Sequence, residues 1–173
     1  MKEENFLHKS IMLDEVLSIL NPSKNETYID CTLGAGGHTR EILKTPECNV
    51  IGIDRDPSVL LLNKNEYKSF GKRLLLVEGK FGDLEKHIKN LGIKKVNGIF
   101  LDLGVSSMQL DNAERGFSFR YDAPLDMRMG KAGQTAFEII NKYKEKDIAN
   151  IIYCYGEERK SRRIAHAIVE ERK

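Results

Sequence analysis

Residues 27–38 read Thr-Tyr-Ile-Asp-Cys-Thr-Leu-Gly-Ala-Gly-Gly-His, and this stretch decides the fold. Its beginning, Thr27 to Cys31, is an apolar run of the strand-forming type. Its end, Thr32 to His38, is rich in glycine, which lets a backbone turn tightly and approach a ligand closely. A short helix is predicted to follow, from about Thr39 to Lys44. The sequence therefore predicts a strand, a glycine-rich turn and a helix, in that order.

The same alternation of strand and helix extends on both sides of this stretch. Asp56 followed by Pro57 is a favourable start for a helix, and Asp83 is expected to cap a later helix that Gly92 ends. Strands that alternate with helices predict an α/β fold with a parallel sheet and helices on both faces. The further strands are predicted at 49–54, 73–78 and 96–102, and the further helices at 10–20, 56–67 and 83–91.

The pattern changes after the fourth predicted strand. Residues 103–134 carry scattered Gly, Ser and Asp without a clear period, and a loop of this length is usually functional or disordered. From Thr135 to Arg172 apolar residues recur at helical spacing. We expect a Rossmann-like core over residues 1–133, in which 103–133 is a substrate loop, and a helical subdomain over residues 134–173.

Composition excludes several classes of protein. The chain has 173 residues, of which 40% are hydrophobic and 31% charged, and its mean hydropathy is −0.43. No apolar run approaches the roughly 20 residues that a membrane span needs. The net charge of +2 gives no nucleic-acid signature by itself, so any contact with phosphates must come from local clusters.

Cysteine and histidine usage indicates neither disulfides nor a metal. Cys31, Cys48 and Cys154 are odd in number and lack CxxC spacing, and the four histidines lie far apart. We expect free thiols in a reducing cytoplasm and no metal cofactor. The first residues carry acids and no apolar segment of the kind that a signal peptide has, so a cytoplasmic location is expected.

Candidate ligand-binding residues follow each predicted strand, where parallel sheets bind their ligands. Gly34, Gly36 and Gly37 follow the first strand, and Asp54 ends the second. A carboxylate at that place can accept hydrogen bonds from both hydroxyls of a ribose. Phe81, after the third strand, offers an apolar face to an adenine, and Asp102 ends the fourth strand.

The spacing of the glycines limits which class of ligand the turn is expected to bind. The turn reads G-x-G-G, which is neither the G-x-G-x-x-G of dinucleotide-binding proteins nor a P-loop with its lysine. An adenosyl ligand without a pyrophosphate fits better, and S-adenosylmethionine is such a ligand. The alternative of an NAD-dependent oxidoreductase is disfavoured by the same turn and by the lack of hydride-transfer candidates.

Several longer motifs occur together in this chain, the most specific being Leu-Asp-Leu-Gly-Val-Ser-Ser-Met-Gln-Leu-Asp at 101–111. The others are residues 8–15, 28–39, 52–57, 114–119, 124–129 and 155–159. Together they resemble one family, the small-subunit (16S) ribosomal RNA (cytosine-N4)-methyltransferases, also called RsmH or MraW, and the resemblance extends from about residue 6 to the last residue.

The resemblance implies a class I methyltransferase fold, S-adenosylmethionine as methyl donor, and N4 methylation of a cytidine in the decoding centre of the small subunit. Its partner would be ribosomal RNA in the small ribosomal subunit. Carried over position by position, the cofactor contacts fall on Gly36, Gly37, His38, Asp54, Phe81, Asp102 and Gln109.

Asp102 is the predicted catalytic residue, because a carboxylate at this strand end can orient the donor and accept a hydrogen bond from the cytosine amine. The chain has Asp-Leu-Gly-Val at 102–105, where many amino-methyltransferases have an Asp/Asn/Ser-Pro-Pro-Tyr/Phe motif. Ser106 and Ser107 are second candidates.

Aromatic and basic residues of the long loop are the predicted RNA contacts. Arginine and aromatic planes stack on unpaired bases, and basic residues track phosphates. The loop contacts are expected at Arg115, Phe117, Phe119 and Arg120, with further phosphate contacts from the basic run Arg159, Lys160, Arg162 and Arg163.

The chain is shorter than a complete class I methyltransferase fold is expected to need. A class I methyltransferase sheet has seven strands in the order 3-2-1-4-5-7-6, and only four strands are predicted here. We therefore expect an incomplete sheet that lacks the C-terminal part. The alternative function is a non-catalytic or impaired fragment that binds S-adenosylmethionine or RNA, and the sequence leaves open whether the chain dimerises.

Overall fold

The computed structural model describes residues 10–172, and the residues before and after this range, including part of the 8–15 motif, lie outside it. The chain divides into two compact units, one up to Met108 and the other from Gln109. Residues 109–133, which the sequence analysis grouped with the core, pack within the second unit. The functional division at residues 133 and 134 stays a prediction.

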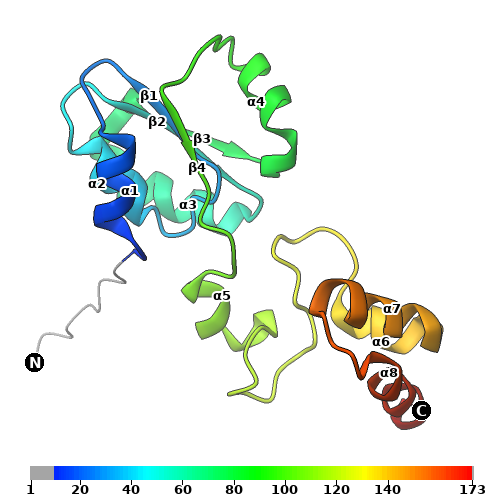
Figure 1. Cartoon of the computed structure of the whole chain (residues 1–173). Helices are drawn as coiled ribbons and strands as arrows, with labels where there is room; N and C mark the ends of the chain where they lie inside the picture. Colours follow the sequence, from blue (N-terminus) through cyan, green and yellow to red (C-terminus); the bar gives the residue numbers. More distant parts are fainter. Residues whose placement is uncertain (1–9, 173) are drawn as a thin grey trace, which may run out of the picture. The chain divides into compact units, whose positions relative to one another are not determined.

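The first unit is a parallel sheet flanked by helices (Figure 1). Its strand order is β3-β2-β1-β4, and all three neighbouring pairs are parallel. This confirms the predicted α/β class, and the order matches the first four positions of the predicted methyltransferase sheet. The elements are α1 (Leu13–Leu20), β1 (Thr27–Asp30), α2 (Gly37–Leu43), β2 (Asn49–Asp54), α3 (Pro57–Glu66), β3 (Leu74–Glu78), α4 (Leu84–Asn90) and β4 (Gly98–Phe100).

Alternate residues of the central strands point to opposite faces of the sheet, and each face has its own core. Tyr28 and Val50 lie on the face that packs against α1 and α2, and both are buried. Ile29 and Ile51 lie on the other face, under residues of α4. Because both faces are covered, the middle residues of β2, Val50 to Ile53, are all apolar or glycine, as in fully buried strands.

The local predictions hold in most places and need three corrections. The Asp56 side chain accepts a hydrogen bond from Ser58 N at 3.0 Å, so the predicted cap of α3 is confirmed. Asp83 makes no such side-chain bond at the start of α4. The fourth strand spans only Gly98–Phe100 rather than 96–102, and the first helix begins at Leu13 rather than at residue 10.

The loop region also contains structure that the sequence did not indicate. A short helix, α5 (Ser107–Asp111), and a 3-10 turn at Ala113–Arg115 form within the aperiodic stretch. Asn112 caps the 3-10 turn through a bond from Glu114 N. Both elements are too short to produce a visible hydrophobic period.

The second unit is helical, as predicted. Its helices are α6 (Ala136–Lys142), α7 (Glu145–Gly156) and α8 (Ser161–Glu171). Thr135 and Glu138 form a capping box at the start of α6. Ile148, Ala149 and Ala165 are its buried core, where α7 packs against α8. Within residues 10–172, no helix combines the length and apolar character that crossing a membrane would require.

Candidate functional site

The turn that follows β1 links the ends of all the neighbouring strands. Leu33 N donates to Ile53 O at 3.1 Å, and Cys31 N donates to Phe100 O at 3.1 Å. These bonds hold the end of β1 between the ends of β2 and β4. The carboxyl edge of the sheet, where a ligand is expected, is therefore organised around this turn.

Two glycines of the turn lie close to other side chains, and at Gly36 the close contact and the positive φ leave room for glycine alone. Gly36 has φ +75°, and a Cβ built on it would lie 2.2 Å from Asn63 Oδ1 and 2.5 Å from Tyr67 Cε2. A Cβ on Gly37 would lie 2.0 Å from Ser10 Oγ. Gly36 precedes the first turn of α2, as a glycine at an N-cap can. The glycines predicted from the sequence thus have a steric reason.

Asp54 is fixed directly against this turn. Its Oδ2 accepts a hydrogen bond from Gly34 N at 3.0 Å, and its Oδ1 accepts one from Asp56 N at 2.9 Å. The carboxylate is half-buried at the end of β2. Backbone donors therefore set its orientation, which leaves further lone pairs for hydroxyl donors of a ligand.

Asp102, which follows β4, is held by a hydrogen bond to the same glycine turn. Its backbone N donates to Thr32 Oγ1 at 2.7 Å, while the residue itself is exposed just beyond β4. Phe81 follows β3 and is 49% exposed. The bond from Gly79 N to Asp54 O, at 2.9 Å, holds the segment before Phe81 beside the end of β2. The structure thus brings together the glycine turn, Asp54, Asp102 and the Phe81 segment.

His38 is buried, and its ring already has partners. Nε2 lies 2.9 Å from Ile11 O, and the ring meets Phe100 edge-on with 5.5 Å between centroids. The imidazole therefore joins α2 to the segment before α1 and to β4. The predicted contact of this position with a cofactor stays a prediction.

Asp30 is a buried carboxyl that the sequence analysis did not select. Burial raises its pKa to about 6, although hydrogen bonds from Thr39 and Thr32 and the nearby His38 act to lower it. Thr39 Oγ1 donates to it at 2.7 Å, and Thr32 N at 3.1 Å. Asp30 therefore ties the first turn of α2 and the start of the glycine turn to the end of β1.

Gln109 and Arg115 lie in the second unit, where both hold the loop together. Gln109 is buried, and its Nε2 donates to Met129 O at 3.1 Å. Arg115 Nη2 donates to the same carbonyl at 3.1 Å and to Arg128 O at 2.8 Å. Their predicted contacts with cofactor and RNA stay predictions, and the structure adds a role in shaping residues 109–129.

The other predicted RNA contacts differ in exposure. Phe119 is 102% exposed, Arg120 is exposed and Phe117 is half-buried. The basic run at the start of α8 is also exposed, at Arg159, Lys160, Arg162 and Arg163. A fully exposed phenylalanine beside an arginine suits stacking on an unpaired base.

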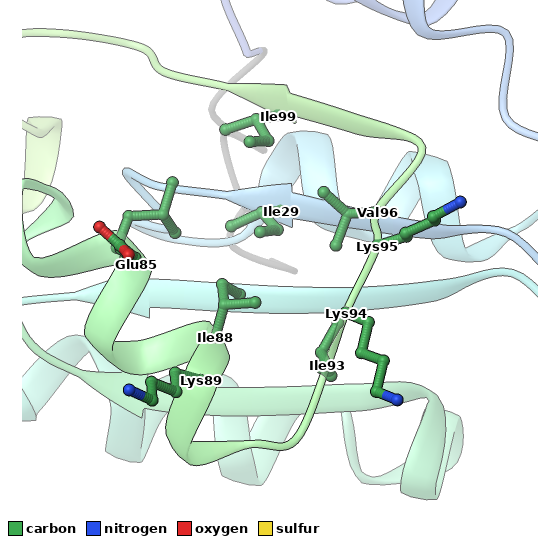
Figure 2. A pocket seen from close by; sticks show the side chains of 10 residues that line it. Ile29, Glu85, Ile88, Lys89, Ile93, Lys94, Lys95, Val96 and Ile99 are labelled. Atoms are coloured by element: carbon green, nitrogen blue, oxygen red, sulfur yellow. The ribbon is translucent and has the colours of Figure 1, made fainter.

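A hollow of the first unit lies elsewhere, between α4 and the sheet (Figure 2). Its volume is about 460 Å³, and apolar side chains including Ile29, Ile88 and Ile99 line it, with Lys89, Lys94 and Lys95 also in its wall. None of the predicted site residues belongs to this lining. Among residues 10–172, no cluster of three or more His, Cys, Asp or Glu side chains could hold a metal.

The residues at the carboxyl edge fit an adenosyl group. Gly36 is buried against Asn63 and Tyr67, where even a single Cβ would collide, so the close packing of the turn requires glycine there. A carboxylate for ribose hydroxyls, Asp54, is hydrogen-bonded to that turn, and an exposed aromatic face, Phe81, follows the next strand. This edge of a Rossmann-like sheet is the class of site that binds nucleosides.

Comparison with known proteins then gives the family. A family model described as the MraW methylase family matches residues 5–173, so this chain belongs to that family. It is 53% identical over 165 residues to the ribosomal RNA small subunit methyltransferase H of Rhodospirillum rubrum, covering 95% of this chain and 51% of that protein. The protein of the same name from Parvibaculum lavamentivorans is 50% identical over 165 residues, covering 95% of this chain and 49% of that protein.

The chain thus spans about half the length of the curated relatives that it matches. Among solved structures it is similar to an RNA methyltransferase from Salinibacter ruber in complex with S-adenosyl-L-homocysteine. That similarity has a TM-score of 0.44 and 18% identity, and it covers 58% of this chain and 61% of that one.

Proposed function

We propose that this chain carries the S-adenosylmethionine-binding site of an RNA methyltransferase that methylates N4 of a cytidine in small-subunit ribosomal RNA. The observation that carries the proposal is the hydrogen-bonded group formed by the glycine turn, Asp54 and Asp102 at one edge of the sheet. Membership of the MraW methylase family supports the reaction class. A cytoplasmic location follows from such a substrate.

Each residue of the group has a chemical task in this proposal. Asp54 accepts hydrogen bonds from the ribose hydroxyls, the turn from Gly36 to His38 approaches the ligand with its backbone, and Phe81 covers the adenine. Bound S-adenosylmethionine supplies an electrophilic methyl group on a sulfonium sulfur. The exposed carboxylate of Asp102 accepts a hydrogen bond from the cytosine amine, whose lone pair is otherwise delocalised into the ring.

The RNA contacts are assigned to the second unit. Phe119 stacks on a base that has left its helix, and Arg120 contacts a phosphate beside it, because both are exposed in the loop. Arg115 and Gln109 hold this loop in shape through Met129 O. The basic run at the start of α8 adds salt-dependent contacts with phosphates.

The test measures ligand binding and methyl transfer separately. Calorimetry with S-adenosylmethionine, S-adenosylhomocysteine and NAD should show binding of the first two only. Methyl transfer from labelled donor is then measured on unmethylated small subunits, with the full-length Rhodospirillum rubrum relative as positive control.

The results separate the alternatives. Binding with transfer that Asp102→Ala abolishes supports the whole proposal, whereas binding without transfer identifies the chain as a binding fragment. Full turnover by the Asp102→Ala variant would overturn the role of Asp102. Binding of NAD in place of S-adenosylmethionine would overturn the choice of ligand.

A further inference from the structure

Two side chains hold the glycine turn, one from Asn63 in α3 and one from Tyr67, the residue that caps the C-terminal end of α3. Asn63 Nδ2 donates to Gly34 O at 2.8 Å, and the hydroxyl of Tyr67 donates to Ala35 O at 2.8 Å. The two residues are four apart, so they lie one above the other on the same face of the helix. Two consecutive carbonyls of the turn are thereby bound by one rigid element.

Both side chains are buried, so surrounding atoms restrict their movement. Asn63 is 0% exposed and Tyr67 is 6% exposed. Asn63 Nδ2 also donates to Val59 O at 2.8 Å, so its two hydrogens bridge the helix and the turn. An asparagine in the buried stripe of a helix costs free energy unless its polar atoms are paired, so a role beyond packing is indicated.

The same two residues define the space under Gly36. Its α-carbon faces Asn63 Oδ1 and the ring of Tyr67 so closely that no side chain fits between them. Asn63 Oδ1 is buried and has no hydrogen-bond partner within the described residues. The turn therefore rests on α3 both through its carbonyls and through its van der Waals surface.

We infer that Asn63 and Tyr67 are positioning residues for the ligand site, and that they fix the glycine turn in its ligand-binding conformation before the ligand arrives. The inference rests on the proposed function, because the turn is the part of the site that approaches S-adenosylmethionine. Pre-formed sites bind more tightly because less ordering remains to be done on binding. Loosening the turn should therefore weaken binding although neither residue touches the ligand.

The test uses Tyr67→Phe in the full chain, which removes one hydroxyl and keeps the ring under Gly36. We expect it to weaken binding of S-adenosylhomocysteine roughly 3- to 10-fold, the value of one net hydrogen bond. In the ligand-free chain, amide hydrogen exchange of Gly34 and Gly36 should become faster. Asn63→Ser should act in the same direction.

Tyr28→Phe is the matched control. It removes the hydroxyl of a buried tyrosine of the same unit, which is hydrogen-bonded to Glu26 Oε2 and lies 3.3 Å from Leu20 O, away from the turn. It should lower thermal stability at least as much, because its main acceptor is charged, and leave both the affinity and the exchange of Gly36 unchanged. Equal loss of affinity in Tyr28→Phe and Tyr67→Phe would show a general stability effect and overturn the inference.

The remaining outcomes keep the two proposals apart. Wild-type affinity and exchange in Tyr67→Phe and Asn63→Ser would overturn the inference and leave the proposed function intact. No binding of S-adenosylhomocysteine by the wild type would overturn the proposed function, and with it any role of Asn63 and Tyr67 in binding. Faster exchange of Gly36 in Tyr67→Phe would then show only that Tyr67 holds the turn.

Discussion

Asp54 is the residue on which the choice of an adenosyl ligand depends most directly. Its carboxylate is already oriented by Gly34 N and Asp56 N, so a ribose needs no rearrangement of this side chain. We predict that Asp54→Asn weakens S-adenosylhomocysteine binding by roughly 10- to 100-fold, because hydrogen bonds to a charged acceptor are lost. Titration calorimetry measures the change. Asp147→Asn, which alters an exposed acid in α7 of the second unit, serves as control, and equal affinity of both variants would contradict the role of Asp54.

Asp30 should make stability depend on pH in the acidic range. Burial raises its pKa to about 6 in the folded chain, above the ordinary aspartate value of 3.8. A raised pKa contributes stability that is complete below the unfolded value and is lost as pH rises through the folded value. The wild type should lose up to about 3 kcal/mol of unfolding free energy through this group between about pH 4 and about pH 7.

Asp30→Asn tests this origin, because an amide cannot ionise. Urea unfolding of the variant should show a shallower loss of stability over the same pH range than unfolding of the wild type. The amide can still pair with Thr32 N and the hydroxyl of Thr39. Parallel pH profiles for the two proteins would mean that Asp30 is not the responsible group.

Single residues also show where sequence reasoning stops. Gly36, Asp54 and Asp102 were selected because strand ends can be read from an apolar run and its first polar residue, and the structure brings them together. Asn63 and Tyr67 were missed because α3 carries almost no hydrophobic periodicity, so its buried face was not visible as a stripe. The signal that could have found them is the spacing Val59, Asn63, Tyr67, a buried helical face with a polar residue in its middle.

At the scale of elements, Arg73 joins the end of α2 to the beginning of β3. Its Nη1 lies 2.9 Å from Leu43 O and 3.2 Å from Thr45 O, and its guanidinium lies 5.3 Å from the ring centre of Phe70. A helix leaves its last carbonyls without partners, and here Arg73 Nη1 binds those of Leu43 and Thr45 and, at 3.4 Å, also Cys48 O.

We predict that Arg73→Met destabilises the first unit by about 2 kcal/mol, the value of hydrogen bonds from a charged donor. Arg73→Lys should recover only part of the loss, since an ammonium cannot stack on Phe70 and reach these carbonyls in the same way. Urea unfolding measures both, with Lys72→Met, an exposed neighbour, as the control. A loss no larger than that of the control would show that the bonds of Arg73 contribute little.

Helices and strands could be predicted where an apolar pattern of one kind continued over the whole element. The second strand was predicted with its observed bounds, Asn49–Asp54, because it is apolar up to a terminal carboxylate. The fourth strand was predicted too long, because the apolar Val96 and Leu101 flank a pairing segment that is only Gly98–Phe100. The short helix α5 was not predicted, since its shape depends on tertiary bonds such as that from Gln109 to Met129 O rather than on local pattern.

At the scale of the whole molecule, the reactivity of the cysteines can measure the opening of each unit separately. Cys31 and Cys48 are buried in the first unit, and burial raises the pKa of Cys31 to about 11, so neither should react while that unit is folded. Cys154 is exposed on α7 of the second unit. A thiol reagent should therefore label Cys154 at once and the other two only when the first unit opens.

Ligand binding should slow the labelling of the three cysteines to different extents. If S-adenosylhomocysteine binds to the folded first unit, a concentration of about 100 times its Kd should slow labelling of Cys31 and Cys48 by about 100-fold. Labelling of Cys154 should not change, because opening of the first unit does not govern its exposure. Mass spectrometry of the labelled peptides follows all three thiols in one sample, and NAD in place of S-adenosylhomocysteine is the control. Equal slowing of all three would contradict independent opening of the two units, while no slowing of Cys31 and Cys48 would place the ligand outside the first unit.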